Sequence, residues 1–129
     1  MVLFVLCLSM LFVGCTDAEQ EEQVMISYEQ ILQEEAKALM ESETDYVILD
    51  VRTEEEFAEG YIAGAILIPD YEIKEKAESI LPDKDQLILV YCRSGRRSKL
   101  AASELVTLGY TNVKEFGGII DWSYGIVRD

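Results

Sequence analysis

The sequence predicts an α/β fold in which helices cover a central, mainly parallel sheet. Two observations carry this prediction. Short apolar runs typical of buried strands alternate with segments of helical spacing, and polar or reactive residues follow two of these runs. Ligand sites of such sheets lie beyond the carboxyl ends of the strands, so we expect the chemistry there. A chain of 129 residues is expected to form one domain.

The first part of the expected domain contains one helix followed by one strand. Ser27 and Gln30 fit a capping box, and the apolar stripe after them extends the expected helix to Met40. The apolar run 46–49 then predicts a buried strand that ends at Asp50.

A second helix and a second strand follow. Thr53 and Glu56 form another candidate capping box, and Gly60 ends the short helix that this box opens. The run 65–68 predicts a strand, which Pro69 terminates.

The next elements surround the candidate site. Residues 71–80 have helical spacing, with one face made by Ile73, Ala77 and Ile80, and a turn follows at 82–83. A strand is predicted at 87–91 and a helix at 98–108, which Gly109 stops.

The end of the chain completes the sheet. We expect a last short strand at 113–116, a turn at Gly117-Gly118, and one or two helical turns within 119–124. In this order of elements Asp50 and Cys92 both follow predicted strands, so both are expected at one edge of the sheet.

The stretch 87–100 joins a strand, a tight loop and a helix, and it carries the candidate chemistry. Cys92 ends the apolar run, and an arginine-rich loop precedes the helix. The N–H groups of that loop are expected to converge at the positive end of the helix dipole, which makes a cradle for an anion. A thiolate is an anion, so we expect Cys92 to act as a nucleophile at neutral pH.

The charge of the chain narrows the classes of partner. The formal net charge is -14, which disfavours nucleic acid and anionic membrane surfaces as partners. Four of the 11 basic side chains nevertheless gather near the cysteine, namely Arg93, Arg96, Arg97 and Lys99. A local positive site on an acidic protein favours a small anionic substrate, and a solvated basic patch is the alternative.

The chain has no histidine, which excludes Ser-His-Asp and Cys-His catalysis and the usual zinc sites. Any activation of a cysteine must therefore come from loop amides and arginines. The three cysteines, Cys7, Cys15 and Cys92, show no metal-ligand spacing. We expect neither a metal nor a cofactor.

The N-terminal segment is typical of an export signal. Its first 13 residues are almost wholly apolar and short for a membrane span, and Phe12-Val13-Gly14-Cys15 resembles the bacterial lipobox. The expected parts are a lipoprotein-type signal peptide at 1–14, an acidic tether at 15–23 and a folded domain at 24–129. The resemblance implies that Cys15 carries lipid and alone anchors an extracytoplasmic protein to the bacterial membrane. One alternative is a plain signal or anchor, in which case the protein is secreted or periplasmic. The other is that the segment is a buried strand or helix of the fold.

Four motifs together resemble those of the rhodanese (sulfurtransferase) family over roughly residues 24–125. They are Asp50-Val51-Arg52, Gly60-Tyr61-Ile62-Ala63-Gly64-Ala65, the loop from Cys92 to Ser98, and Gly117-Gly118-Ile119-Ile120-Asp121-Trp122. Tyr61 stands where the family usually has a histidine. The order of the four motifs implies the family's three-layer α/β/α sandwich with a mainly parallel sheet.

The resemblance also implies a reaction, the transfer of sulfane sulfur. The Cys92 thiolate attacks a donor such as thiosulfate, and a thiophilic acceptor, cyanide or a thiol, takes the outer sulfur from the resulting persulfide. The substrate-binding residues it implies are Arg93, Ser94, Gly95, Arg96, Arg97 and Ser98. Arg97 is the first choice for neutralising the oxyanion of the donor. Ser98 has a simpler alternative role as the N-cap of its helix.

Three residues near the site are expected to be structural. Asp50 is expected to cap the turn that follows it. Arg52 is expected to pair with a carboxylate such as that of Glu56 or Glu59. Trp122 is expected in the core or in a pocket wall. Because the catalytic set is complete in one chain, we expect a monomer.

Two other functions stay open. Phosphatases of related fold use Cys-x5-Arg, whereas here Arg97 lies five residues after Cys92 and Ser98 lies six after it. The loop is therefore one residue short of the pattern that surrounds phosphate, which disfavours a phosphatase or arsenate reductase. A non-enzymatic binding or sensory module of the same fold is the other alternative, and the retained cysteine in a cationic loop disfavours it.

Overall fold

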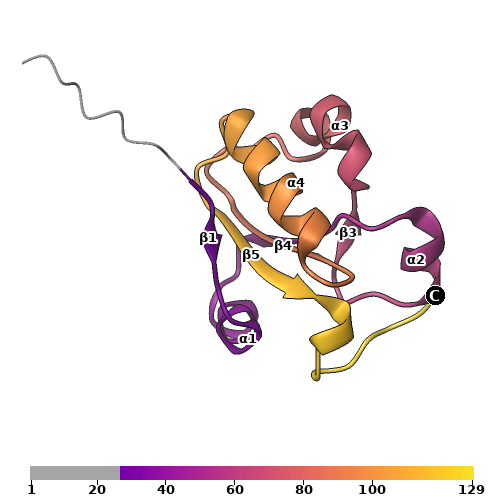
Figure 1. The fold of residues 1–129 in the computed structure, drawn as a ribbon. Helices are drawn as coiled ribbons and strands as arrows, with labels where there is room; N and C mark the ends of the chain where they lie inside the picture. The colour runs from indigo at the N-terminus through magenta and orange to yellow at the C-terminus, as the bar shows by residue number, and fades with distance from the viewer. Residues whose placement is uncertain (1–26) are drawn as a thin grey trace, which may run out of the picture.

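The computed structural model describes residues 27–129 (Figure 1). The expected signal peptide at 1–14, the lipidated Cys15 and the tether at 15–23 lie outside the described residues. Among the helices of the described part, none combines the length and the apolar character that crossing a bilayer requires.

A five-stranded sheet forms the centre of the domain, and every strand pair in it is parallel. In spatial order the strands are β1 (Glu29–Gln30), β5 (Val113–Gly118), β4 (Leu87–Cys92), β2 (Tyr46–Asp50) and β3 (Ile66–Leu67). The central strand β4 is buried along its whole length. A strand of a parallel sheet that is covered on both faces has no solvent face, which explains the unbroken apolar run.

Helices flank the sheet on both sides. They are α1 (Gln33–Ser42), α2 (Glu54–Glu59), α3 (Ile73–Ile80) and α4 (Arg96–Thr107), with short 3-10 turns η1 (Asp70–Glu72) and η2 (Ile119–Asp121). Figure 1 shows α3 and α4 together on one side and α1 on the other. Neighbouring residues of β4 divide between two core clusters, because Leu89 packs with Ala36 of α1 and Val90 with Leu105 of α4. The predicted α/β sandwich is confirmed.

The short helix α2 follows its sequence signals closely. The hydroxyl of Thr53 accepts a hydrogen bond from the N–H of Glu56, and the carboxylate of Glu56 accepts one from the N–H of Thr53, each at 3.2 Å. This is the predicted capping box. Gly60 ends the helix with a φ of 146°, a region that favours glycine.

The predicted start of the first helix is wrong. Glu29 and Gln30 form the edge strand β1, and α1 begins only at Gln33. Glu29 pairs in register with Lys114 of β5, and their side chains form an ion pair of 2.6 Å. A strand at the free edge of β5 satisfies backbone groups that a helix from Ser27 would leave unpaired at that edge.

Three smaller predictions are corrected as well. Helix α4 begins at Arg96 with Gly95 as its N-cap, so Ser98 lies inside the first turn. The pair Gly117-Gly118 forms the end of β5 rather than a turn. Ile80 is 45% exposed, because the buried face of α3 continues from Ile73 and Ala77 to Leu81, four residues further on, and not to Ile80.

Candidate active site

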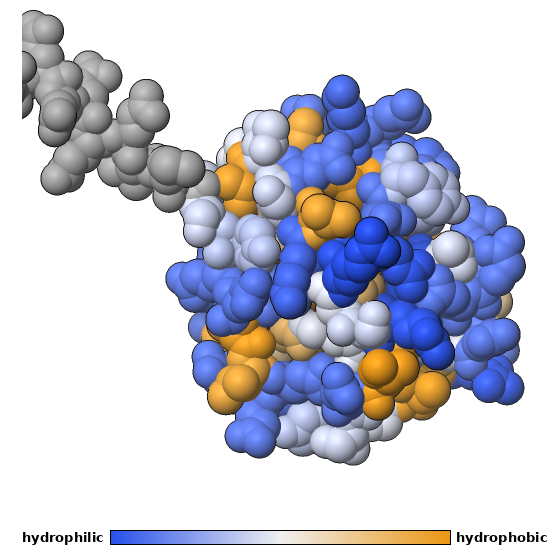
Figure 2. All heavy atoms as spheres, in the orientation of Figure 1, coloured by the Kyte–Doolittle hydropathy of each residue, from blue (hydrophilic) through white to orange (hydrophobic). Residues whose placement is uncertain are grey.

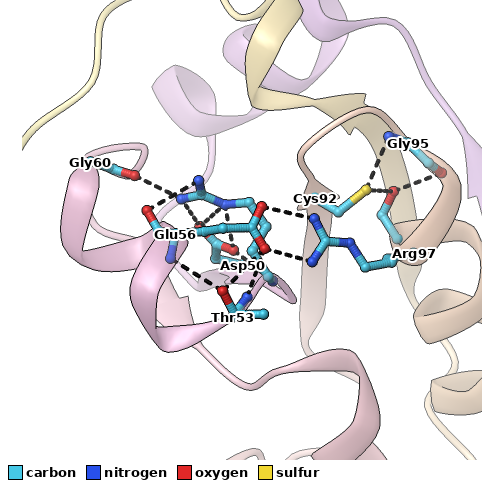
Figure 3. A network of polar contacts seen from close by, with 9 residues as sticks. Asp50, Thr53, Glu56, Gly60, Cys92, Gly95 and Arg97 are labelled. Atoms are coloured by element: carbon cyan, nitrogen blue, oxygen red, sulfur yellow. Dashed lines mark hydrogen bonds and ion pairs between the residues drawn. The ribbon is translucent and has the colours of Figure 1, made fainter.

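Cys92 is the last residue of β4, and its thiol is buried at the carboxyl edge of the sheet. The residue is 1% exposed and is a free cysteine. The N–H of Gly95 lies 3.0 Å from Sγ, and the hydroxyl oxygen of Ser98 lies 3.3 Å from it (Figure 3). Among the described residues, Gly95 is therefore the loop amide that bonds the sulfur, and a serine hydroxyl provides the second contact.

Gly95 turns the chain from the strand into the helix. Its φ of 106° lies in the left-handed region, where glycine has no steric penalty. The hydroxyl of Ser98 donates to the carbonyl oxygen of Gly95 at 3.0 Å, which closes the turn beneath the sulfur. Cys92 thereby faces the start of the 12-residue helix α4, whose dipole favours an anion at that end.

The cysteine loop rests on the end of β5, and Figure 1 shows the two segments meeting there. Cys92 is paired with Gly118 in the sheet, and the N–H of Ile120 donates to the carbonyl oxygen of Arg93 at 3.2 Å. A Cβ atom at position 118 would overlap the backbone of Arg93 and Ser94. The φ of Gly118 is -125°, an ordinary extended value, so glycine is needed for space and not for conformation.

The cations of the loop differ in what they contact. The guanidinium of Arg97 donates two hydrogen bonds to the carboxylate of Glu56, at 2.6 and 2.9 Å (Figure 3). This pairing lowers the pKa of Glu56 from 4.5 to about 2 and raises the pKa of Arg97. Three other cations, Arg93, Arg96 and Lys99, are exposed and have no ion-pair partner within residues 27–129. Glu56 thus already compensates the charge of Arg97, the residue that the sequence analysis favoured for neutralising the oxyanion of the donor.

Asp50 and Arg52 form a buried ion pair beside the loop. The Nη2 atom of Arg52 lies 2.7 Å from the Asp50 carboxylate and donates to the carbonyl oxygen of Gly60, also at 2.7 Å. Asp50 also accepts from the N–H of Arg52 at 2.9 Å, as expected for a residue that caps the next turn. Arg52 pairs with a carboxylate as predicted, but the partner is Asp50, which is buried with it, and not Glu56 or Glu59.

A cavity of about 340 Å³ opens beside the cysteine loop. Arg93, Ile120 and Trp122 line one part of its wall, and Arg52 and Ile126 line another. Trp122 is thus a pocket-wall residue, and its ring packs against Phe116 of the core with centroids 5.5 Å apart. Figure 2 shows apolar side chains next to strongly hydrophilic ones on this face. The volume lies at the lower end of the range for small-molecule sites.

Glu115 is a residue of this site that the sequence reasoning missed. It is 2% exposed, and both of its carboxylate oxygens accept from the N–H of Gly117, at 3.2 and 3.1 Å. Burial raises the pKa of Glu115, and the hydrogen bonds from the Gly117 N–H oppose that rise. The sequence contains one signal for the burial of Glu115. In a strand, residues two apart lie on the same face, so Glu115 shares a face with the apolar Val113.

Within residues 27–129, no group of three histidine, cysteine or acidic side chains is arranged to hold a metal ion.

Comparison with known proteins gives consistent matches. A family model described as rhodanese-like domain matches residues 32–124. The thiosulfate sulfurtransferase PspE of Escherichia coli (strain K12) is 41% identical over 73 residues, which cover 57% of this chain and 70% of that protein. A solved rhodanese with anions from E. coli has a TM-score of 0.61 and 37% identity, covering 65% of this chain and 99% of that one. A rhodanese-related protein from Thermoplasma volcanium has a TM-score of 0.69 and 34% identity, covering 79% and 100%.

Proposed function

The chain belongs to the rhodanese-like domain family, and we propose that it moves sulfane sulfur from an anionic donor such as thiosulfate to a thiophilic acceptor through a persulfide on Cys92. Relatives named as sulfurtransferases support this class of reaction. The observation that carries the proposal is the buried Cys92 sulfur, which the Gly95 N–H contacts at 3.0 Å at the start of α4. An amide and a helix N-terminus at that place favour a sulfur that carries negative charge.

The proposed reaction has two displacement steps. The Cys92 thiolate attacks the outer sulfur of thiosulfate, the S–S bond of the donor breaks, and sulfite leaves with the electron pair. Cyanide or a thiolate then attacks the outer sulfur of the persulfide, and the electron pair of the broken S–S bond returns to Cys92. The cycle restores the thiolate and needs no external oxidant or reductant.

We assign the sulfonate end of the donor to Arg93 rather than to Arg97. Arg93 is exposed, follows Cys92 directly and lines the cavity beside the loop. Arg97 is engaged by Glu56, so it has less charge to offer an incoming anion. Guanidinium groups bind tetrahedral oxyanions through several parallel hydrogen bonds, which suits this role.

The test is a mass measurement of the Cys92 peptide after treatment of the full chain with thiosulfate. We expect a gain of one sulfur, about 32 Da, which cyanide or a thiol removes, and no gain in the Cys92→Ala variant. An unmodified Cys92 in the folded protein would contradict the proposal and favour a binding module. Turnover of a chromogenic phosphate ester at the rate seen with thiosulfate would favour a phosphatase instead.

We also propose that Cys15 carries a lipid that anchors an extracytoplasmic protein, and that one chain acts as a monomer. The lipobox-like stretch from Phe12 to Cys15 after an apolar run supports the anchor. Labelling of cells with a fatty-acid analogue should mark the wild type and spare Cys15→Ser. An unlabelled wild-type protein would contradict the anchor.

Light scattering of the Cys15→Ser protein tests the monomer.

A further inference from the structure

The cavity beside the cysteine loop has more room than the donor needs. Its volume of about 340 Å³ is within the range that organic ligands occupy, whereas thiosulfate and cyanide are ions of only a few atoms. Arg93, the cation that follows Cys92 in the chain, lines one part of it. Ile120, Trp122 and Ile126 provide an apolar lining that neither ion can use. A ligand with an apolar body would fill the space and cover this lining.

The charged residues of the cavity wall favour a ligand with an uncharged body. Arg52 is paired with Asp50, and Glu56 is paired with Arg97, so these charges are already compensated. Glu59, at the end of α2, is exposed and also lines the cavity. Its negative charge opposes a second anionic group at that end of the cavity.

Ile126 belongs to the segment 123–129, which follows the cysteine loop's support in η2. Figure 1 shows this segment running from η2 to the end of α2. Ile126 packs directly on the backbone of Gly60, because a Cβ atom at position 60 would lie only 2.9 Å from Cδ1 of Ile126. Gly60, Gly125 and Ile126 all line the cavity. The segment is therefore part of the cavity wall.

Tyr61 holds this segment in place. Its N–H donates to the carbonyl oxygen of Val127 at 2.9 Å, and the N–H of Val127 donates to the carbonyl oxygen of Tyr61 at 2.8 Å, which makes an antiparallel bridge. The Tyr61 hydroxyl donates to the carboxylate of Asp129 at 2.5 Å. Its ring stacks on that of Phe57 in α2, with centroids 4.2 Å apart. The backbone, hydroxyl and ring of one residue thus fix Val127 and, with it, the neighbouring Ile126.

Two further hydrogen bonds fix the segment on either side of Ile126. The indole Nε1 of Trp122 donates to the carbonyl oxygen of Gly125 at 3.1 Å. The Nε atom of Arg128 donates to the carbonyl oxygen of Glu59 at 2.9 Å. Ile126 lies between these bonds and is nevertheless 54% exposed. An apolar side chain that is held in place and still open to a cavity is available to a ligand.

We propose that Ile126 determines which acceptor takes the sulfur, by binding the hydrocarbon chain of an alkyl thiol, and that Tyr61 positions Ile126 for this contact. The proposal rests on the sulfur transfer proposed above. The alkyl thiolate attacks the outer, protonated sulfur of the Cys92 persulfide while its chain lies against the apolar lining. The S–S bond of the persulfide breaks, its electron pair returns to Cys92, and an alkyl hydropersulfide leaves. Each methylene group removed from water is expected to strengthen binding by about 2- to 4-fold.

The experiment compares acceptors of growing chain length on the full chain after loading with thiosulfate. The acceptors are hydroxyalkyl thiols of two, four and six carbons, and mass spectrometry times the loss of the added sulfur from the Cys92 peptide. Each rate is divided by the rate with cyanide in the same protein, so effects common to all acceptors cancel. The variants are Ile126→Ser, Tyr61→Ala and Tyr61→Phe. The control is Ile80→Ser, the same change at an isoleucine of α3 that is 45% exposed and lies outside the cavity lining.

We expect the wild type to favour the six-carbon thiol over the two-carbon thiol by about 10-fold or more, and Ile126→Ser to reduce this preference by about 3-fold or more. Tyr61→Ala should reduce it as well, at an ordinary melting temperature, whereas Tyr61→Phe keeps the stack on Phe57 and should retain most of it. The control should match the wild type. A wild type that is indifferent to chain length, or an Ile126→Ser protein with the wild-type preference, would overturn the proposal.

A second measurement separates this proposal from the sulfur transfer on which it rests. N-ethylmaleimide and N-hexylmaleimide alkylate the Cys92 thiolate without any sulfur donor, and the ratio of their rates reports the same apolar lining. We expect the hexyl reagent to be favoured in the wild type and less so in Ile126→Ser. A wild-type chain that takes up no sulfur would contradict the sulfurtransferase proposal, whereas equal maleimide ratios in these two proteins would overturn the role of Ile126.

Discussion

The guanidinium of Arg97 and the carboxylate of Glu56 form a two-bonded ion pair that joins the first turn of α4 to the first turn of α2. The hydroxyl of Thr53 also contacts Glu56, at 3.2 Å. The pair fixes the cysteine loop relative to α2, one wall of the cavity. Because both side chains are about a quarter exposed, its contribution to stability is expected to be modest.

We predict that Arg97→Gln and Glu56→Gln each lower the free energy of unfolding by about 1 kcal/mol, because each removes the same partly exposed pair. The double variant should lose less than the sum of the two. Urea denaturation of the four proteins provides the measurement. Additive losses would mean that the two side chains act independently.

The same pair predicts a dependence of stability on pH. Hydrogen bonds from Arg97, and then from Thr53, lower the pKa of Glu56 from 4.5 to about 2 in the folded chain. The unfolded chain therefore binds more protons between these values, and the stabilisation is present above pH 4.5 and is lost as the pH falls toward 2. The stability difference between wild type and Glu56→Gln should shrink between pH 6 and pH 3. A constant difference would contradict the assignment.

Arg93, the cation of the loop that lines the cavity and that is unpaired within residues 27–129, should govern donor binding. We predict that Arg93→Ala raises the KM for thiosulfate about 5- to 10-fold without changing the melting temperature, because Arg93 is exposed and lines the cavity. Lys74→Ala, which removes an exposed cation on α3, is the matched control and should leave KM unchanged. Steady-state kinetics at two salt concentrations check this, since screening should weaken donor binding in the wild type more than in Arg93→Ala. An equal rise of KM in Arg93→Ala and Lys74→Ala would mean that these cations act only through the overall electrostatic field of the protein.

Gly118 should be irreplaceable for reasons of space. We predict that Gly118→Ala removes sulfur loading and lowers stability by about 2 kcal/mol or more, because its methyl group would overlap the backbone of Arg93. Gly125→Ala meets no atom within 4 Å and has a φ of 91°, so it should cost only about 1–2 kcal/mol of backbone strain and retain loading. Thermal melts and the mass assay separate the two. Normal loading in Gly118→Ala would show that the loop adjusts.

The sequence predicted correctly those elements whose burial pattern or hydrogen bonds involve residues close together in the chain. The apolar run before Cys92 became the buried central strand, since burial on both faces demands such a run. The Thr53 and Glu56 capping box and the stop at Gly60 also form as expected, because their hydrogen bonds join residues close in sequence.

The errors arose where distant segments meet. The pairing of Glu29 with Lys114 overrides the helical signal at the start of the domain, and nothing in the local sequence reveals that pairing. The partner of Arg97 is 41 residues away, and the bond from the Ser98 hydroxyl to the Gly117 carbonyl oxygen depends on the packing of α4 against β5. Spacing therefore located the cysteine loop, and only the fold shows that Arg97 is the cation of this loop whose charge is paired.

The buried pair of Asp50 and Arg52 leads to the last prediction. Removing one charged partner leaves the other without compensation in a nearly water-free place, so Asp50→Ala is expected to cost about 3–5 kcal/mol, and Arg52→Met a similar amount. The double variant leaves no uncompensated charge and should be more stable than either single one. Urea denaturation tests this. A double variant as unstable as the sum of the singles would show that the two residues stabilise the fold through separate contacts, such as the bond from Arg52 to the Gly60 carbonyl, rather than through each other.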